Sequence, residues 1–134
     1  MSGRIDDRRA TYRVLLLDDS EISLEVAAEV LRRDGFEVRT ALDLDGFDGH
    51  LTDWSPQVIL TDVNMPGMTG NELCRQLKRR YETAHVPVVL CSSLAPEELA
   101  RLARACEADG FVTKSDDLEG LADEVRALCE TILW

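Results

Sequence analysis

The chain has 134 residues, enough for one domain with a single hydrophobic core. Its composition is 45% hydrophobic and 31% charged, which excludes an intrinsically disordered chain, and its formal net charge of -11 at pH 7 disfavours direct binding to nucleic acid. No apolar stretch reaches the length of a membrane span and no secretory signal follows the N-terminus, so we expect a cytoplasmic protein. Because the four cysteines are widely spaced, we expect reduced thiols rather than disulfides or a zinc site.

The first part of the chain predicts an extension followed by a strand. Residues 1–11 are polar and lack periodicity, so we expect them to precede a domain that spans residues 12–134. Residues 13–17 (RVLLL) are typical of a buried strand, and Asp18 and Asp19 follow it directly. Two carboxylates are therefore predicted at the end of the first strand.

Two helical patterns surround the second predicted strand. Ser20 is a suitable N-cap for the first helix, and Gly35 closes it. The apolar residues that fall at helical spacing in this helix are Ile22, Val26, Ala27, Val30 and Leu31. Residues 36–40 alternate like a strand. Residues 43–54 contain two glycines but keep a helical pattern, with one apolar face formed by Leu44, Phe47, Leu51 and Trp54.

The third predicted strand leads into a loop of unusual composition. Residues 58–61 are apolar or β-branched and fit a buried strand, which stops at Asp62. Pro66, Gly67 and Gly70 then favour a loop. A carboxylate therefore stands at the carboxyl end of a strand, where open α/β sheets place their sites.

The rest of the chain continues the alternation of helices and strands. The expected elements are a helix over residues 71–81, a strand over residues 86–91, a helix that begins at Pro96, a strand over residues 110–113 and a helix over residues 117–132. Ser92 follows the fourth strand, and Lys114 follows the fifth. Five strand patterns alternating with five helical patterns predict an α/β fold, a doubly wound parallel sheet covered on both faces.

The carboxyl ends of parallel strands lie at the same edge of a sheet. If the first and third strands are neighbours, Asp18, Asp19 and Asp62 converge there, with Ser92 and Lys114 close by. Three carboxylates without a cation would repel one another, whereas Mg²⁺ prefers a few oxygen ligands together with water and a phosphoryl group. The lysine amine can neutralise an anion and the serine hydroxyl can donate a hydrogen bond. The set suits phosphoryl transfer onto a carboxylate, although each residue alone also fits a turn, a helix cap or a solvated side chain.

Four segments together resemble the receiver domain of two-component response regulators. They are LLLDDS at 15–20, ILTDVNMPGMTG at 59–70, PVVLCSS at 87–93 and GFVTK at 110–114. The resemblance extends over residues 12–132 and implies a flavodoxin-like sheet of five strands in the order 2-1-3-4-5 with five helices. It also implies that Asp62 accepts a phosphoryl group, with Mg²⁺ as cofactor, from a phosphohistidine on a sensor histidine kinase or phosphotransfer protein.

The resemblance assigns a metal-binding role to four residues. Asp19 matches the direct Mg²⁺ ligand of the family, and Asp18 matches the ligand that acts through water. Asp62 matches the residue that is both nucleophile and metal ligand. Asn64 matches the position whose main-chain carbonyl binds the metal.

Three further residues match functional positions of the family, two of them in its switch. Ser92 corresponds to the switch hydroxyl, Lys114 to the lysine that contacts the phosphoryl group, and Phe111 to the aromatic residue that swings inward on activation.

Ser115 stands where the family commonly has a proline in a cis bond, so we expect a trans bond and a reshaped loop here. Leu94 is apolar and cannot orient an attacking water, so we expect slow loss of the phosphoryl group.

Alternative functions stay open, although we expect a signalling module rather than an enzyme. A pseudo-receiver would use the same fold as an interaction module without phosphorylation. A haloacid-dehalogenase-like phosphohydrolase also uses an aspartate after a strand, but it requires an acid two residues later, where this chain has Asn64. We expect the modified domain to act either on a separate downstream protein target or on an effector domain that is missing from this sequence. Its expected docking or dimer surface is the fourth helix, fifth strand and fifth helix around Phe111.

Overall fold

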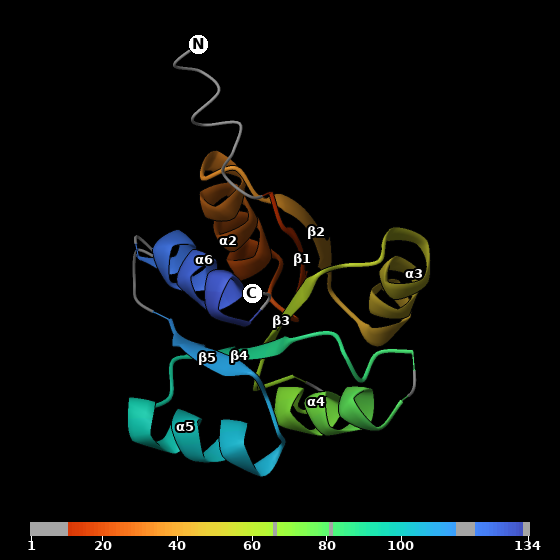
Figure 1. The fold of residues 1–134 in the computed structure, drawn as a ribbon, viewed down its shortest axis with the longest axis vertical. Coiled ribbons are helices and arrows are strands. Elements are labelled where there is room, and N and C mark those ends of the chain that lie inside the picture. Colours follow the sequence, from red (N-terminus) through yellow and green to blue (C-terminus); the bar gives the residue numbers. More distant parts are fainter. Residues whose placement is uncertain (1–10, 66, 81, 115–119, 133–134) are drawn as a thin grey trace.

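The computed structural model describes residues 11–65, 67–80, 82–114 and 120–132, and its central element is a five-stranded sheet (Figure 1). All strands are parallel, in the order β2-β1-β3-β4-β5. The strands are β1 (Arg13–Leu17), β2 (Glu37–Ala41), β3 (Val58–Asp62), β4 (Val88–Ser92) and β5 (Gly110–Thr113). The helices are α2 (Glu21–Arg33), α3 (Leu44–Trp54), α4 (Gly70–Arg79), α5 (Pro96–Ala105) and α6 (Leu121–Ile132). The predicted doubly wound α/β fold and its strand order are confirmed.

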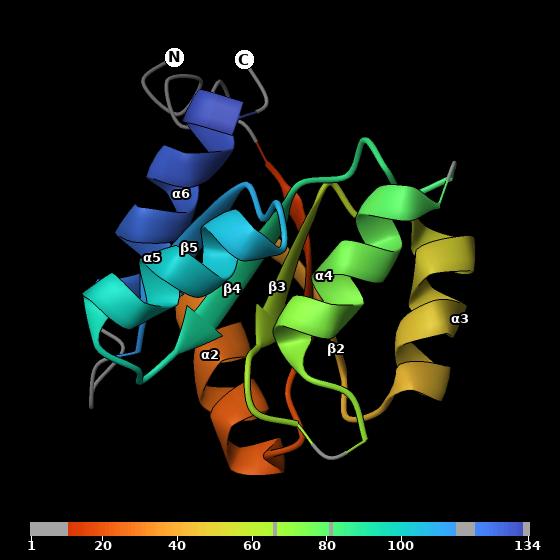
Figure 2. The same cartoon turned by 90° about the horizontal axis from the view of Figure 1, so that it is seen from below.

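Helices cover both faces of the sheet, α2 and α6 on one side and α3, α4 and α5 on the other (Figures 1 and 2). The central strand β1 shows how the sequence produces these layers. Val14 and Leu16 pack into the core beneath α2 and α6, whereas Leu15 and Leu17 pack into the core beneath the other three helices. Because all four side chains are buried, β1 is a continuous apolar run without polar alternation.

Side-chain caps fix the starts of the first two helices. The backbone N–H of Ser23 donates to Ser20 Oγ at 3.3 Å, so the predicted N-cap of α2 is confirmed. The N–H of Gly46 donates to the Asp43 side chain at 2.8 Å, which stabilises the first turn of α3 despite its glycines. Pro96 lies in the first turn of α5, as predicted.

Among the helices of the described residues, none has the length and apolar character needed to cross a membrane.

Two of the apolar residues that fall at helical spacing in α2 are exposed rather than buried. Ile22 is 78% exposed and Val26 is 43% exposed. The buried stripe of this helix is instead Leu24, Ala28 and Leu31, which are also spaced by four and three residues. The helix therefore carries apolar residues on more than one face, and packing against the sheet and α6 selects between faces that periodicity alone does not separate.

Several element boundaries differ by a few residues from the predicted ones. Strand β2 begins at Glu37 and β4 begins at Val88, after a proline that has no N–H to donate to the sheet. Ser92 is the last residue of β4 rather than the residue that follows it. The expectations for residues 1–10, for the bond between Lys114 and Ser115, and for a helix start at residue 117 lie outside the described residues.

Candidate functional site

Three carboxylates meet at the carboxyl edge of the sheet. Asp18 and Asp19 follow β1, Asp62 ends β3, and these two strands are neighbours in which Leu17 pairs with Thr61. One oxygen from each of the three aspartates lies within 4.8 Å of the others, and the described residues contain no second cluster of this kind. Asp18 is buried, Asp62 is half-buried and Asp19 is exposed, so the cluster is accessible from the Asp19 side.

Lys114 brings a positive charge into the same cluster. Its Nζ lies 2.9 Å from Asp18 Oδ2 and 3.3 Å from Asp62 Oδ1. The backbone positions this residue, because the N–H of Lys114 donates to the Ser92 carbonyl at 2.8 Å and so extends the pairing of β5 with β4. Asp18 is held from its other side, since its Oδ1 accepts a hydrogen bond from the N–H of Ser20 at 3.0 Å. The lysine thus bridges carboxylates from two strands.

The loop between β3 and α4 passes unusually close to the acidic site. A Cβ atom added to Gly70 would lie 2.1 Å from the carbonyl oxygen of Asp62, so only glycine fits here. The N–H of Gly70 donates to the Val63 carbonyl at 2.9 Å and closes the loop. Thr69 and Glu72 form a capping box that starts α4 directly afterwards. The glycine and the cap together return the chain to the sheet edge beside Asp62.

Burial, charges and hydrogen bonds in the cluster together raise the pKa values of Asp62 and Lys114. Burial raises the pKa of Asp62 above its ordinary value; the Lys114 ammonium opposes this effect, and the charges of Asp18 and Asp19 add to it. Burial alone would lower the pKa of Lys114, but the hydrogen bond to Asp18 and the charges of Asp62 and Asp18 outweigh it and raise that pKa. The lysine is therefore a firmly protonated cation, whereas the half-buried carboxylate of Asp62 resists ionisation.

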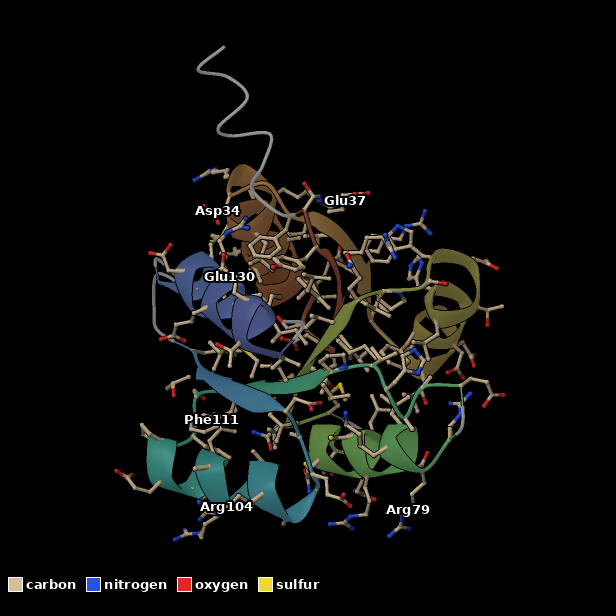
Figure 3. All side chains as sticks on the ribbon, viewed as in Figure 1. Asp34, Glu37, Arg79, Arg104, Phe111 and Glu130 are labelled. Carbon is tan, nitrogen blue, oxygen red and sulfur yellow. The ribbon has the colours of Figure 1, made fainter. Side chains whose placement is uncertain are left out.

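The other predicted site residues surround this cluster at different depths. Ser92 is buried, and its Oγ accepts a hydrogen bond from the N–H of Leu94 at 3.1 Å. Asn64 is exposed in the loop that follows Asp62. Phe111 is 36% exposed and lies on the side of β5 that faces α5 (Figure 3). Its ring therefore stands outside the core rather than tucked into it.

Two further features lie beside Asp62, and neither is predicted from the sequence. Cys91 is the β4 strand partner of Asp62, and burial raises the pKa of its thiol to about 12, which keeps it protonated and unreactive. A hollow of ≈ 250 Å³ opens next to the cluster, lined by Lys114 and Asp62 and by the exposed α2 residues Ile22 and Val26 among others. The only signal for this hollow was the pair of apolar residues that do not belong to the buried stripe of α2.

The donor set fits a hard divalent cation. Carboxylate oxygens are the ligands that Mg²⁺ prefers, and the three clustered aspartates supply them from one accessible edge. The ammonium of Lys114 satisfies only one oxygen each of Asp18 and Asp62. A cation held by these carboxylates would offset their mutual repulsion.

A model of the family described as "Response regulator receiver domain" matches residues 14–126 of the chain. The chain belongs to this family. The receiver domain is 35% identical over 116 residues to the response regulator PleD of Caulobacter vibrioides and 29% identical over 116 residues to the phosphate regulon transcriptional regulatory protein PhoB of Rhizobium meliloti. Each match covers 87% of the chain but only 26% of PleD and 51% of PhoB, so the chain spans about half or less of these relatives.

A solved structure matches the receiver domain over nearly all of the described fold. The chemotaxis response regulator CheY4 of Vibrio cholerae superposes with a TM-score of 0.78 at 26% sequence identity. The match covers 89% of this chain and 99% of CheY4. The chain is thus a receiver domain of a two-component response regulator, a class of signalling module, and the resemblance inferred from its motifs is confirmed.

Proposed function

We propose that Asp62 accepts a phosphoryl group from a phosphohistidine on a partner histidine kinase or phosphotransfer protein. The observation that carries this proposal is the position of the Lys114 amine, 3.3 Å from Asp62 Oδ1 within a cluster of three carboxylates. Asp18, Asp19 and Asp62 would hold Mg²⁺, with the main-chain carbonyl of Asn64 as a further ligand. When bound, Mg²⁺ would offset the negative charge of the carboxylates and of the phosphoryl oxygens.

The transfer requires a nucleophile in line with the leaving group and little other covalent chemistry. A carboxylate oxygen of Asp62 attacks the phosphorus, the phosphorus–nitrogen bond of the phosphohistidine breaks, and the imidazole nitrogen keeps the electron pair. Because the pKa of Lys114 is raised, its ammonium is available to move from Asp62 to an oxygen of the incoming phosphoryl group. The amine thus exchanges one anionic partner for another without a proton transfer.

Ser92 and Phe111 would read out the modification. Ser92 Oγ now accepts a hydrogen bond from the N–H of Leu94, so its own hydroxyl hydrogen can be donated to a phosphoryl oxygen on Asp62. A shift of this strand end would make room for the exposed ring of Phe111 to turn inward, which would change the surface formed by α5, β5 and α6. We expect partner binding or dimerisation at that surface, and slow hydrolysis of the acyl phosphate because Leu94 is apolar.

PhoB of Rhizobium meliloti is described as a transcriptional regulatory protein and is about twice as long as the matched region. An effector domain linked to a receiver of this kind, or a separate target protein, would respond to the modified surface. A pseudo-receiver without phosphorylation is the competing function that experiment must exclude.

The proposal is tested by intact-mass spectrometry after incubation with a small phosphodonor and Mg²⁺. We expect the mass of one added phosphoryl group on the parent protein, none after Asp62→Asn, and none when the divalent cation is chelated. Asp53→Asn, at an exposed position in the last turn of α3, is the matched control and should be labelled like the parent. An unlabelled parent protein would favour the pseudo-receiver, and full labelling of Asp62→Asn would require another acceptor.

A further inference from the structure

Two of the exposed large apolar residues lie beside the acidic site, away from the hollow that Ile22 and Val26 line. Leu42 is 47% exposed and Leu44 is 36% exposed, and both belong to the connection from β2 into α3. They line a hollow of ≈ 440 Å³ together with Met65 and Met68, which are only partly buried and lie in the loop between β3 and α4. Figure 2 shows both loops at the same end of the sheet. We name this surface, formed by Leu42, Leu44, Met65 and Met68, the methionine hollow.

The rim of the methionine hollow carries a single sign of charge. Asp19, Asp43 and Asp45 line it, all three are exposed, and no lining residue among the described part of the chain is basic. One oxygen of Asp43 accepts the N–H of Gly46 as the cap of α3, and the other two carboxylates lie within the reach of a partner. An apolar floor with an acidic rim complements a surface that is apolar in its middle and basic at its edges.

We propose that the methionine hollow binds an amphipathic helix of a partner protein, with large apolar side chains facing the floor and lysine or arginine facing the rim. Methionine side chains are flexible and polarisable, so a floor of methionine and leucine can adapt to the apolar face of a helix. The acidic rim opposes nucleic acid and anionic membranes at this hollow, and it would repel the same rim on a second copy of the chain. A basic helix is the occupant that satisfies both the floor and the rim.

The methionine hollow shares one residue with the acidic site. Asp19 lines the hollow and also belongs to the cluster with Asp18 and Asp62. A helix bound here would lie beside Asp62 but on a different surface from the one around Phe111. This binding requires neither a phosphoryl group nor a metal ion, so its test is separate from the test of phosphorylation.

The experiment uses the unphosphorylated protein in the presence of a chelator and two synthetic helical peptides. Both peptides carry leucine at the same positions; one has lysine and arginine on its polar face, and the other has glutamate and glutamine. The chain has three methionines, so ¹³C-methyl labelling of methionine gives signals from Met65 and Met68 with little overlap. We expect the basic peptide alone to shift both signals saturably, with a Kd below about 0.1 mM, and high salt to weaken this binding.

Exposed positions supply the variants and their controls. The double variant Leu42→Ser and Leu44→Ser should weaken binding by about tenfold, and Asp45→Lys should weaken it several-fold. The double variant Ile22→Ser and Val26→Ser removes exposed apolar groups that do not line the methionine hollow. This variant should bind the peptide like the parent. Equal binding of the acidic peptide, no saturable shift of the methionine signals, or a dimer that the Leu42 and Leu44 variant disrupts would each overturn the proposal.

Discussion

Asp62 combines burial, two like charges and one opposite charge, and burial is the largest of these effects on its pKa. Because the folded-state pKa lies above the ordinary value of 3.8, ionisation of this group costs stability as the pH rises through the folded-state value. In the presence of a chelator, Asp62→Asn should therefore raise the melting temperature at neutral pH, and the gain should shrink as the pH approaches the ordinary value. Thermal melts of both proteins across pH, with Asp53→Asn as control, measure this difference. A gain that grows on acidification would have the wrong sign.

Lys114 is the counter-charge whose removal should have the opposite effect. Its Nζ contacts Asp18 at 2.9 Å and Asp62 at 3.3 Å, and a methionine at this position would leave those carboxylates to repel each other. We expect Lys114→Met to lower the free energy of unfolding by about 2 kcal/mol in a chelator. Excess Mg²⁺ should restore more stability to this variant than it adds to the parent. An equal Mg²⁺ effect on the two proteins would argue against a metal site shared with Lys114.

At the scale of elements, the connection from β3 to α4 depends on the absence of a side chain at Gly70. An added Cβ would lie 2.1 Å from the Asp62 carbonyl oxygen and 3.1 Å from Val63 Cα, and both contacts are with backbone that cannot move freely. We expect Gly70→Ala to lower the free energy of unfolding by about 3 kcal/mol and to reduce labelling of Asp62.

Gly49 provides the matched control within α3. A Cβ added there would meet no atom within 4 Å, so Gly49→Ala should stabilise the protein by about 0.5–1 kcal/mol through its helix propensity. Urea unfolding of the two variants separates steric conflict from a general effect of replacing glycine. Similar unfolding midpoints for Gly70→Ala and the parent would show that the loop can move away from Asp62.

At the scale of the whole molecule, Arg126 joins the last helix to the connection between α2 and β2. Its side chain is buried, its Nε donates to Asp34 Oδ2 at 2.9 Å, and its guanidinium lies 4.4 Å from the ring centroid of Phe36. In Figure 3, Asp34 lies close to α6, which carries this arginine. Removing the arginine would leave a carboxylate and a carbonyl oxygen without this donor.

Arg126→Met should lower the free energy of unfolding by about 3 kcal/mol. Arg33→Met is the control, because Arg33 and Glu29 form a shorter pair of 2.6 Å whose side chains are 73% and 64% exposed. An exposed pair of this kind contributes little, so we expect almost no change in that variant. The unfolding midpoints in urea compare the two. If both variants lose the same stability, burial does not determine the strength of the pair at Arg126.

Fold and site differ in how far the sequence could predict them. Strand ends are readable because buried parallel strands such as β1 are continuous apolar runs, and the polar residues that follow, Asp18 and Asp19, must share one edge. The buried face of α2 cannot be predicted from the sequence, because Ile22 and Val26 lie at helical spacing just as the core residues of this helix do. The methionine hollow could not be predicted from the sequence either, because it forms only where two separate segments of the chain meet.

Phosphorylation of Asp62 would convert its side-chain carboxylate into an acyl phosphate. Borohydride reduces an aspartyl phosphate to homoserine, so reduction after phosphorylation, followed by peptide sequencing, locates the modified residue. We expect homoserine at position 62 and unchanged aspartate at positions 18 and 19. Homoserine at either of those positions, or none anywhere in a protein that had gained a phosphoryl group, would contradict this expectation.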